Sequence, residues 1–392
     1  MNKLISVLLY VFCVFLFISG IERAVGQGAD FALDAIKILA PGADNPRNSE
    51  GDFAILKEGR ILFVFTQYNG NSTSDHAPAG LAAIESSDNG TTWTEPRIVL
   101  RQDGGLNIMS VSLLRLSDNR LALFYLRKYS AQDCRPFVCY SENEGQTWTA
   151  PGPCITDQIG YYVVNNSRVV QLSDGTLLIP TALHNTDTER FNPNAKMFCY
   201  RSDDLGKTWR RTGEAANPGK VVFQEPGLVE LADGRVLMYI RTNGGCQYLS
   251  WSSDKGETWS EAQRSDFVSP MSPMSIAPLP GSDKLLCVWN NSPNQRDPLT
   301  LAIVNMKLEV QRRWDIDRSV DANGTVINGG EPRWFCYPAI LPLTSDLQKS
   351  GQTGQALIAY CAGLKKNWGL DTTKIVRVRW NIKSPEISPE VR

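Results

Sequence analysis

Residues 86–93 read Ser-Ser-Asp-Asn-Gly-Thr-Thr-Trp, and three further segments of the chain repeat this pattern. They are Ser141–Trp148, Ser202–Trp209 and Ser252–Trp259, so the template is S-x-D-x-G-x-T-W, with Asn143 replacing aspartate once. An aspartate or asparagine at the third position can accept backbone N–H bonds across a tight turn, and the glycine supplies a positive φ. Because no copy has the closing acidic ligand of an EF-hand calcium loop, the motif predicts a structural turn between strands. We call it the Asp box.

A second repeat indicates the number of structural units. A leucine, a short turn and an apolar run recur six times, and the leucines are Leu56, Leu116, Leu172, Leu231, Leu279 and Leu343. Each copy is typical of a β-hairpin, and neighbouring leucines lie 48 to 64 residues apart. Propeller repeats run about 40–50 residues plus loops. We therefore predict an all-β fold, a six-bladed β-propeller with four-stranded antiparallel blades. Pairing of Lys374–Ile382 with Phe31–Leu39 should close the ring.

The N-terminal segment Met1–Gly26 resembles a targeting sequence. It begins with Lys3, continues through the apolar run Leu4–Ile18 and ends in small residues. This order is typical of a secretory signal peptide, and the run is short for a membrane anchor, which needs roughly 20 residues. We expect residues 1–26 to be removed and residues 27–392 to form one propeller domain, secreted or periplasmic, without a membrane span and monomeric.

Composition excludes several classes of function. The net charge is -1, with 40 basic and 41 acidic residues, so nothing favours nucleic-acid binding. The eight cysteines after residue 26 have no metal-ligand spacing, and several lie in apolar runs, which favours buried thiols for most of them. With only His76 and His184, neither a histidine metal site nor a Ser/His triad is expected. We predict no metal and no cofactor.

Strand direction divides the chain between two faces of the ring. If each inner strand ends at one of the six leucines, the Asp boxes lie on the face opposite to the starts of the inner strands. Function should therefore be sought at those starts, on the face that we call the mouth. Six residues before the leucines stand Glu50, Ser110, Asn166, Glu225, Pro273 and Tyr337.

Charged residues and a tyrosine are expected to gather at the mouth. Glu225 and Tyr337 occupy equivalent places in blades 4 and 6, and Arg241 should return beside Glu225. Further mouth residues are Arg47 before the first inner strand, Asp75 in the blade 1 loop and Arg296 in the blade 5 loop. Three converging guanidinium groups can clamp a carboxylate, because each offers a planar fork of donors. Alternatively, these arginines are solvated surface residues.

This arrangement resembles the bacterial-type exo-sialidases (neuraminidases) over essentially the whole of residues 27–392. The resemblance rests on the Asp boxes, the six hairpins and the ordered set Arg47, Asp75, Glu225, Arg241, Arg296 and Tyr337. Asp75 follows Arg47 by 28 residues and Arg241 follows Glu225 by 16, which is similar to the family's spacings of roughly 25 and about 15 residues. The chain departs from the family at Arg47-Asn48-Ser49, where an R-I-P sequence is usual.

The resemblance implies a retaining exo-glycosidase that removes terminal sialic acid or a related nonulosonic acid from glycans. Arg47, Arg241 and Arg296 would clamp the sugar carboxylate. Tyr337 would be the nucleophile because a neutral phenol is not repelled by that anion, and Glu225 would be its base. Asp75 would be the acid and base, and burial in a closing loop would raise its pKa.

Other candidates and other functions stay open at this point. Glu50 and Arg135 are further candidates for substrate binding, and Arg333 could replace Arg296 in the clamp. The same fold could serve a glycosidase for another acidic sugar such as Kdn. It could equally serve a non-catalytic propeller that binds glycans, which would not need the set Tyr337, Glu225 and Asp75.

Overall fold

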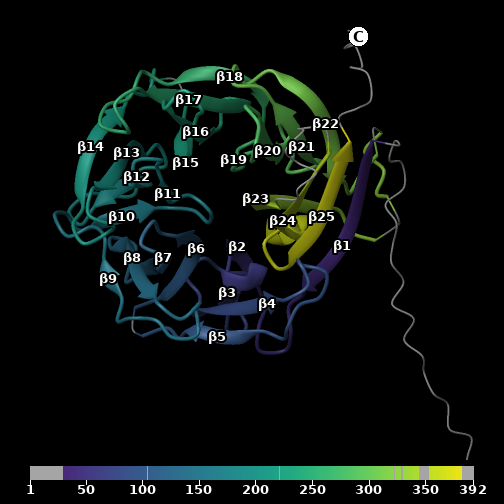
Figure 1. Cartoon of the computed structure of the whole chain (residues 1–392), viewed down its shortest axis with the longest axis horizontal. Coiled ribbons are helices and arrows are strands. Elements are labelled where there is room, and N and C mark those ends of the chain that lie inside the picture. The colour runs from purple at the N-terminus through teal and green to yellow at the C-terminus, as the bar shows by residue number, and fades with distance from the viewer. Residues whose placement is uncertain are drawn as a thin grey trace, which may run out of the picture.

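The computed structural model describes residues 30–103, 105–219, 221–321, 323–327, 330–343 and 353–381. The segment Met1–Gly26, interpreted above as a signal peptide, lies outside these residues. The described chain forms a ring of β-sheets around a central axis (Figure 1). The first strand of each blade lies near the axis, except in blade 3, where β10 lies farther out, and the last strand of each blade lies at the rim (Figure 1).

The strands of the first three blades follow one another along the chain. Blade 1 contains β2 (Asn48–Ile55), β3 (Ile61–Tyr68), β4 (Ala79–Ser86) and β5 (Arg97–Leu100), with the 3-10 turn η1 (Lys57–Gly59) in its hairpin. Blade 2 contains β6 (Asn107–Arg115), β7 (Leu121–Lys128), β8 (Cys134–Ser141) and β9 (Gly152–Pro153). Blade 3 contains β10 (Gly160–Val163), β11 (Val170–Gln171), β12 (Leu177–Thr186), β13 (Lys196–Ser202) and β14 (Arg210–Ala215).

The remaining blades complete the circle, and the N-terminal strand closes it. Blade 4 contains β15 (Phe223–Glu230), β16 (Val236–Thr242), β17 (Cys246–Ser252) and β18 (Gln263–Val268). Blade 5 contains β19 (Ser275–Pro278), β20 (Leu285–Asn290), β21 (Leu299–Val304) and β22 (Val310–Asp317). Blade 6 contains β23 (Arg333–Leu343), β24 (Thr353–Leu364), β25 (Thr373–Asn381) and β1 (Phe31–Leu39), with η3 (Lys365–Asn367) after β24. The antiparallel pairing of β1 with β25 confirms the predicted closure, although Ile382 lies outside the described residues.

The inner strand of blade 3 differs from the predicted continuous strand. It is divided into β10 and β11, both paired with β12, and one parallel pair, Tyr161 with Cys134, joins blades 2 and 3 into a single sheet. Between the two short strands, the Asn166 side chain donates to the carbonyls of Gly51 and Tyr337. In the same segment the Ser167 N–H donates to the Val111 carbonyl and the Arg168 N–H to the Ser112 hydroxyl, both in blade 2, and these bonds compete with the ladder to β12.

The Asp boxes form the predicted turns. In each box the glycine N–H donates to the hydroxyl of the first serine at 2.8 Å, and the threonine N–H donates to the aspartate or asparagine at 2.8–2.9 Å. The serine that opens a box pairs with the residue just after the hairpin turn, for example Ser86 with Ile61 and Ser202 with Leu177. The boxes therefore lie at the hairpin turns, opposite the mouth.

The hydrophobic core is divided among the interfaces between neighbouring blades. One cluster joins Leu62 and Val64 of blade 1 to Leu123 and Cys139 of blade 2, and similar clusters lie at the other interfaces around the ring. Each blade therefore packs against both of its neighbours and contributes to two hydrophobic clusters. This division is expected for a repeat fold whose chain is too long for one continuous core. All eight cysteines between residues 134 and 361 are free and buried, which agrees with the expectation of buried thiols.

Candidate active site

The inner strands are distorted where they enter the mouth. Five residues with side chains have a left-handed backbone there: Glu50 (φ 52°), Ser110 (φ 60°), Ser167 (φ 57°), Glu225 (φ 40°) and Tyr337 (φ 54°). The register of strand pairing shifts at four of them, Glu50, Ser110, Glu225 and Tyr337. The shifts lie between Ser49 and Asp52, Met109 and Ser112, Gln224 and Pro226, and Cys336 and Ala339. A residue held in this region costs of order 1–3 kcal/mol, and such strain clusters at functional sites. A bulge also re-aims the side chain, which turns these positions toward the mouth.

Blades 4 and 6 bring Glu225, Arg241 and Tyr337 into contact. Arg241 Nη1 donates to Glu225 Oε2 at 2.6 Å, and the Tyr337 hydroxyl donates to Glu225 Oε1 at 3.4 Å. Burial, together with the charge of Glu225, raises the pKa of Tyr337 well above its ordinary value, although Arg241 and Arg296 oppose the rise. The phenol is therefore neutral, and its only route to a nucleophile is proton transfer to a base in contact with it.

Blade 1 contributes a second group of charges around Arg47, whose side chain is only 1% exposed. Its Nη1 donates to Asp75 Oδ1 at 2.6 Å and to the Thr73 carbonyl at 3.1 Å. Its Nη2 donates to Glu50 Oε2 at 3.0 Å, and its Nε donates to Ser49 Oγ at 3.0 Å. The guanidinium stacks over Tyr68, 4.4 Å from the ring centroid. Most donors of Arg47 are therefore occupied by the protein itself.

Asp75 is the most exposed member of this group, with 57% of its side chain accessible. Loss of water would raise its pKa, but the Arg47 guanidinium and the charge of Lys128 outweigh that effect and hold the pKa below its ordinary value. The rise expected from the sequence is therefore not found. By contrast, burial raises the pKa of Glu50, against the charge of Arg47.

The backbone of Asp75 is fastened to blade 2. Lys128 Nζ donates to the Asp75 carbonyl at 2.7 Å, and Asn107 Nδ2 donates to the same oxygen at 2.9 Å. Both side chains are buried, with exposed fractions of 2% and 0%. The sequence offers no signal for Lys128. The strand β7 is buried at every position from Leu121 to Leu126, so the usual alternation of buried and exposed residues does not show which way the lysine faces.

Arg296 completes the cationic side of the mouth. It is 7% exposed, and its guanidinium lies 5.9 Å from the ring centroids of both Tyr337 and Trp334. Its hydrogen bonds, to the carbonyls of Trp368 and Met271, are both 3.4 Å long. Within the described ranges no carboxylate pairs with Arg296, and Arg241 Nε is buried without a partner. Arg296 therefore retains donors that a substrate anion can use, whereas the unpaired Nε of Arg241 is itself buried.

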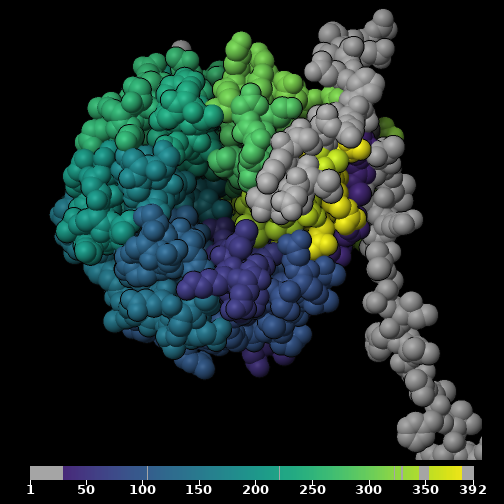
Figure 2. Space-filling model, in the orientation of Figure 1, coloured from purple at the N-terminus to yellow at the C-terminus, as the bar shows by residue number. Residues whose placement is uncertain are grey.

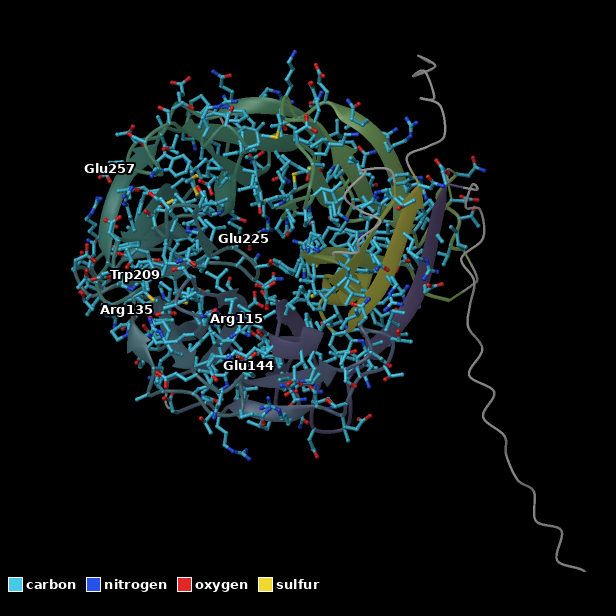
Figure 3. All side chains as sticks on the ribbon, in the orientation of Figure 1. Arg115, Arg135, Glu144, Trp209, Glu225 and Glu257 are labelled. Atoms are coloured by element: carbon cyan, nitrogen blue, oxygen red, sulfur yellow. The ribbon has the colours of Figure 1, made fainter. Side chains whose placement is uncertain are left out.

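The two groups of charges belong to one site at the axis of the ring. Asn166 Nδ2 bonds the carbonyls of Gly51 in blade 1 and Tyr337 in blade 6, at 2.9 and 3.2 Å. The charge of Glu225 also contributes to the raised pKa of Glu50. Glu225 lies near the centre of the ring (Figure 3). By contrast, Trp209 of the third Asp box and Glu257 of the fourth lie toward the rim (Figure 3). The surface is hollowed at the same centre (Figure 2).

Two of the candidate arginines are engaged outside this site. Arg135 forms a two-bond fork with Asp133, at 2.7 and 3.0 Å. Arg333 donates to the Ala362 carbonyl at 2.8 Å and lines a different cavity, of about 390 Å³, together with Asp317 and Lys374. The structure thus brings Arg47, Glu50, Asp75, Glu225, Arg241, Arg296 and Tyr337 to the mouth, and directs Arg135 and Arg333 elsewhere.

The pattern of the BNR repeat-like domain matches residues 86–342, which is more than half of the chain. The chain belongs to the BNR repeat-like family. It is also 24% identical to a sialidase of Paraclostridium sordellii over 229 residues, or 52% of this chain and 55% of that protein. The chain therefore spans about half the length of the curated relative that it matches.

Two solved structures show that this BNR repeat-like chain has the propeller fold of the sialidases. A protein of unknown function from Dyadobacter fermentans superposes with a TM-score of 0.67 at 18% identity, covering 89% of this chain and 99% of that one. The leech intramolecular trans-sialidase, solved with 2,7-anhydro-Neu5Ac, gives a TM-score of 0.67 at 15% identity, covering 89% and 70%. At these identities the similarity establishes the fold alone.

Two features are absent from the described part of this BNR repeat-like propeller. No group of three or more His, Cys, Asp or Glu side chains there could hold a metal ion. Likewise, within the same ranges no helix has the length and apolar character needed to cross a bilayer.

Proposed function

We propose that this protein is a retaining exo-glycosidase that removes a terminal sialic acid, or a related nonulosonic acid, from glycans. The observation that carries the proposal is the contact between the buried Tyr337 hydroxyl and Glu225, which Arg241 fixes from the neighbouring strand. An exposed carboxylate, Asp75, stands in the same mouth. The sequence similarity to a sialidase supports the same chemistry.

In the first step Tyr337 attacks the anomeric carbon, and its phenolic proton passes to Glu225. The bond from that carbon to the leaving oxygen breaks, and Asp75 donates a proton to that oxygen. A neutral phenol suits this role because the carboxylate of the sugar would repel a carboxylate nucleophile, and sialidases are the known exception to the paired-carboxylate rule. The product of this step is a sugar bound covalently to Tyr337.

In the second step water attacks the same carbon and transfers a proton to Asp75. The bond to Tyr337 breaks, and Glu225 returns its proton to the phenolate. Two displacements at one carbon give overall retention of configuration. Asp75 therefore acts first as acid and then as base, as microscopic reversibility requires.

The sugar carboxylate is assigned to the clamp of Arg241, Arg296 and Arg47. Arg296 makes only long bonds to carbonyls and Arg241 binds Glu225 through Nη1, whereas Arg47 would exchange its bond with Asp75 for one with the substrate. Because Arg47 lowers the pKa of Asp75, this exchange would raise that pKa and help Asp75 to hold the proton that it must donate. Substrate binding would then prepare the acid.

The test uses the purified full chain with 4-methylumbelliferyl glycosides of N-acetylneuraminic acid and of Kdn. We expect hydrolysis of at least one, and a fall in kcat of roughly a thousandfold or more for Tyr337→Phe, the order seen when a catalytic nucleophile is lost. Tyr140→Phe is the matched control, since Tyr140 Oη bonds only Asp-box carbonyls in blade 3. A wild-type rate for Tyr337→Phe would exclude Tyr337 as nucleophile.

The same assay distinguishes the alternatives. Faster hydrolysis of the Kdn glycoside would assign the protein to that sugar. Binding of sialosides without turnover would favour a non-catalytic glycan-binding propeller. We further propose that residues 1–26 direct export, so that the protein meets glycans outside the cytoplasm; N-terminal sequencing of the secreted protein would test the cleavage site.

A further inference from the structure

Blade 3 carries an aromatic group at the mouth that the proposed mechanism does not use. The rings of His184 and Phe191 stack with centroids 4.7 Å apart and an angle of 10° between their planes. Tyr161 meets both rings edge-on, at 6.3 Å from His184 and 6.0 Å from Phe191. His184 is buried, yet Phe191 is 56% exposed. We call these three rings the blade 3 platform.

A cavity of about 280 Å³ adjoins this platform. His184 forms part of its wall, and the other lining residues are Leu183, Asn185, Glu189, Arg190, Asn192, Asn194 and Lys196. Amides and charged groups make up most of this lining, and the flat aromatic ring of Phe191, which stacks on His184, lies next to the cavity without lining it. Ligand pockets combine such a surface with a few polar groups that fix orientation, and this combination suits a sugar, which has one apolar face and many hydroxyl groups.

The loop that carries Phe191 is fastened beside the catalytic residues. Asn194 Oδ1 accepts from the Phe223 N–H at 2.9 Å, and the Pro193 carbonyl accepts from Gln224 Nε2 at 3.4 Å. Gln224 immediately precedes Glu225. The stacking of Phe191 on His184 also fixes the ring before any ligand arrives, which lowers the cost of binding.

The platform also adjoins the proposed acid. Lys128 Nζ lies 5.5 Å from the ring centroid of Tyr161 and donates to the Asp75 carbonyl. In the proposed mechanism Asp75 protonates the leaving oxygen of the substrate. The sugar attached to that oxygen must therefore lie close to Asp75 and to Lys128, which binds the Asp75 carbonyl. The strand β23, to which Tyr337 belongs, lies across the central opening from β12 of blade 3 (Figure 1). A displaced group departs on the side away from the nucleophile, which is the side of blade 3.

We infer that the blade 3 platform is a binding site for the neutral sugar ring that leaves the reaction, with Phe191 as its stacking surface. This inference rests on the proposed function, because it takes Asp75 as the acid and Tyr337 as the nucleophile. It adds that the substrate is an oligosaccharide recognised on both sides of the broken bond.

The experiment compares two substrates that share the acidic sugar and differ in the leaving group. Sialyllactose carries a sugar ring there, and sialosyl fluoride carries none. For Phe191→Ala we expect kcat/KM on sialyllactose to fall about tenfold, the order of one aromatic contact, and to change less than about twofold on the fluoride. Phe191→Leu should fall between wild type and Phe191→Ala. Val310→Ala, at a 46% exposed position on blade 5, is the control and should leave both substrates unaffected.

Binding of lactose alone, followed by NMR titration of the wild-type chain and Phe191→Ala, gives a second measurement that needs no catalysis. We expect the variant to bind lactose at least several-fold more weakly. Equal effects of Phe191→Ala on both substrates, or unchanged lactose binding, would overturn the inference while leaving the proposed function in place. Lactose binding that depends on Phe191, without hydrolysis of either substrate, would overturn the proposed function and retain the sugar site.

Discussion

The Asp-box face and the mouth are built by the same blades, yet they use their polar residues in opposite ways. Each Asp box closes its own turn with the same short set of hydrogen bonds, repeated at Ser86, Ser141, Ser202 and Ser252. At the mouth the equivalent positions differ from blade to blade, except that blades 1 and 4 both have glutamate there, Glu50 and Glu225. Glu50, Glu225 and Tyr337 stand at equivalent bulges, but their side chains have different partners: Glu50 binds Arg47 three residues earlier, Glu225 binds Arg241 on the next strand, and Tyr337 binds Glu225 of another blade.

This difference separates scaffold from chemistry. Backbone strain does not separate the two faces, because each Asp box has a left-handed residue with a side chain before its glycine, for example Asn89 before Gly90, just as the mouth has Glu225 and Tyr337. The hydrogen bonds repeated in the Asp boxes stabilise the turns of the blades. The residues at the mouth that differ between blades are the ones available for binding and catalysis. Substitutions that affect stability should therefore lie at the Asp-box face, and those that affect rate should lie at the mouth.

The largest effect on stability is expected for Gly206→Ala in the third Asp box. Gly206 has φ 87°, and an added Cβ would overlap the hydroxyl of Tyr140 in blade 2. We expect a loss of about 3 kcal/mol in the free energy of unfolding, from left-handed strain plus overpacking, measured by urea denaturation. Gly175→Ala is the control, since Gly175 has φ 94° with open space around it, and it should cost about 1 kcal/mol. Equal losses would show that contact between blades at this box contributes nothing.

An intermediate effect, on rate, is expected for Lys128→Met at the mouth. Methionine keeps the length of the buried stem but loses the bond to the Asp75 carbonyl, so kcat should fall about tenfold, in line with the loss of one charge-assisted hydrogen bond. Lys128 also lowers the pKa of Asp75. Its removal raises that pKa, so the acid keeps its proton to higher pH and the basic limb of the kcat profile should move upward.

The control for this variant is Lys255→Met on the opposite face, where Lys255 pairs with Asp174. It should leave both kcat and the pH profile unchanged. If Lys128→Met lowered kcat without moving the basic limb, Lys128 would support the fold of the loop and not the titration of Asp75.

The smallest effect is expected for Asn143→Asp, which restores the consensus in the second Asp box. Asn143 Oδ1 already accepts from the Thr147 N–H at 2.9 Å, and a carboxylate would make the same bond with an added charge. We expect the free energy of unfolding to change by about 0.5 kcal/mol, with no change in kcat. A change in rate would contradict the separation between the two faces.

Much of the architecture could be predicted because its signals are local in the chain. The hairpin turns at Leu56, Leu116, Leu172 and Leu231 each close with a leucine N–H bond to the carbonyl four residues later, at 2.7–2.9 Å. The pairing of Glu225 with Arg241 follows from the same local geometry, because Gln224 lies directly opposite Arg241 in the ladder. Turn chemistry and strand register need only residues close in sequence.

Several features of the site could not be predicted in this way. Nothing in the sequence near Arg47 shows that Asp75 and Glu50 occupy its donors, or that the pKa of Asp75 is lowered as a result. Arg333 stands only four residues before Tyr337, yet its side chain turns to Ala362. The interruption between β10 and β11 coincides with backbone bonds from Ser167 and Arg168 to blade 2, which no local pattern announces.

The sequence by itself thus determined the Asp boxes, the hairpins, the order of the blades and the strand positions that face the mouth. Tertiary structure decided which charges neutralise one another there, which lysine holds the Asp75 loop, and that Phe191 is presented on His184 beside a cavity. The reason is physical: a turn is stabilised by bonds within a few residues, whereas pairing and burial of side chains at the axis depend on how the blades pack around the ring.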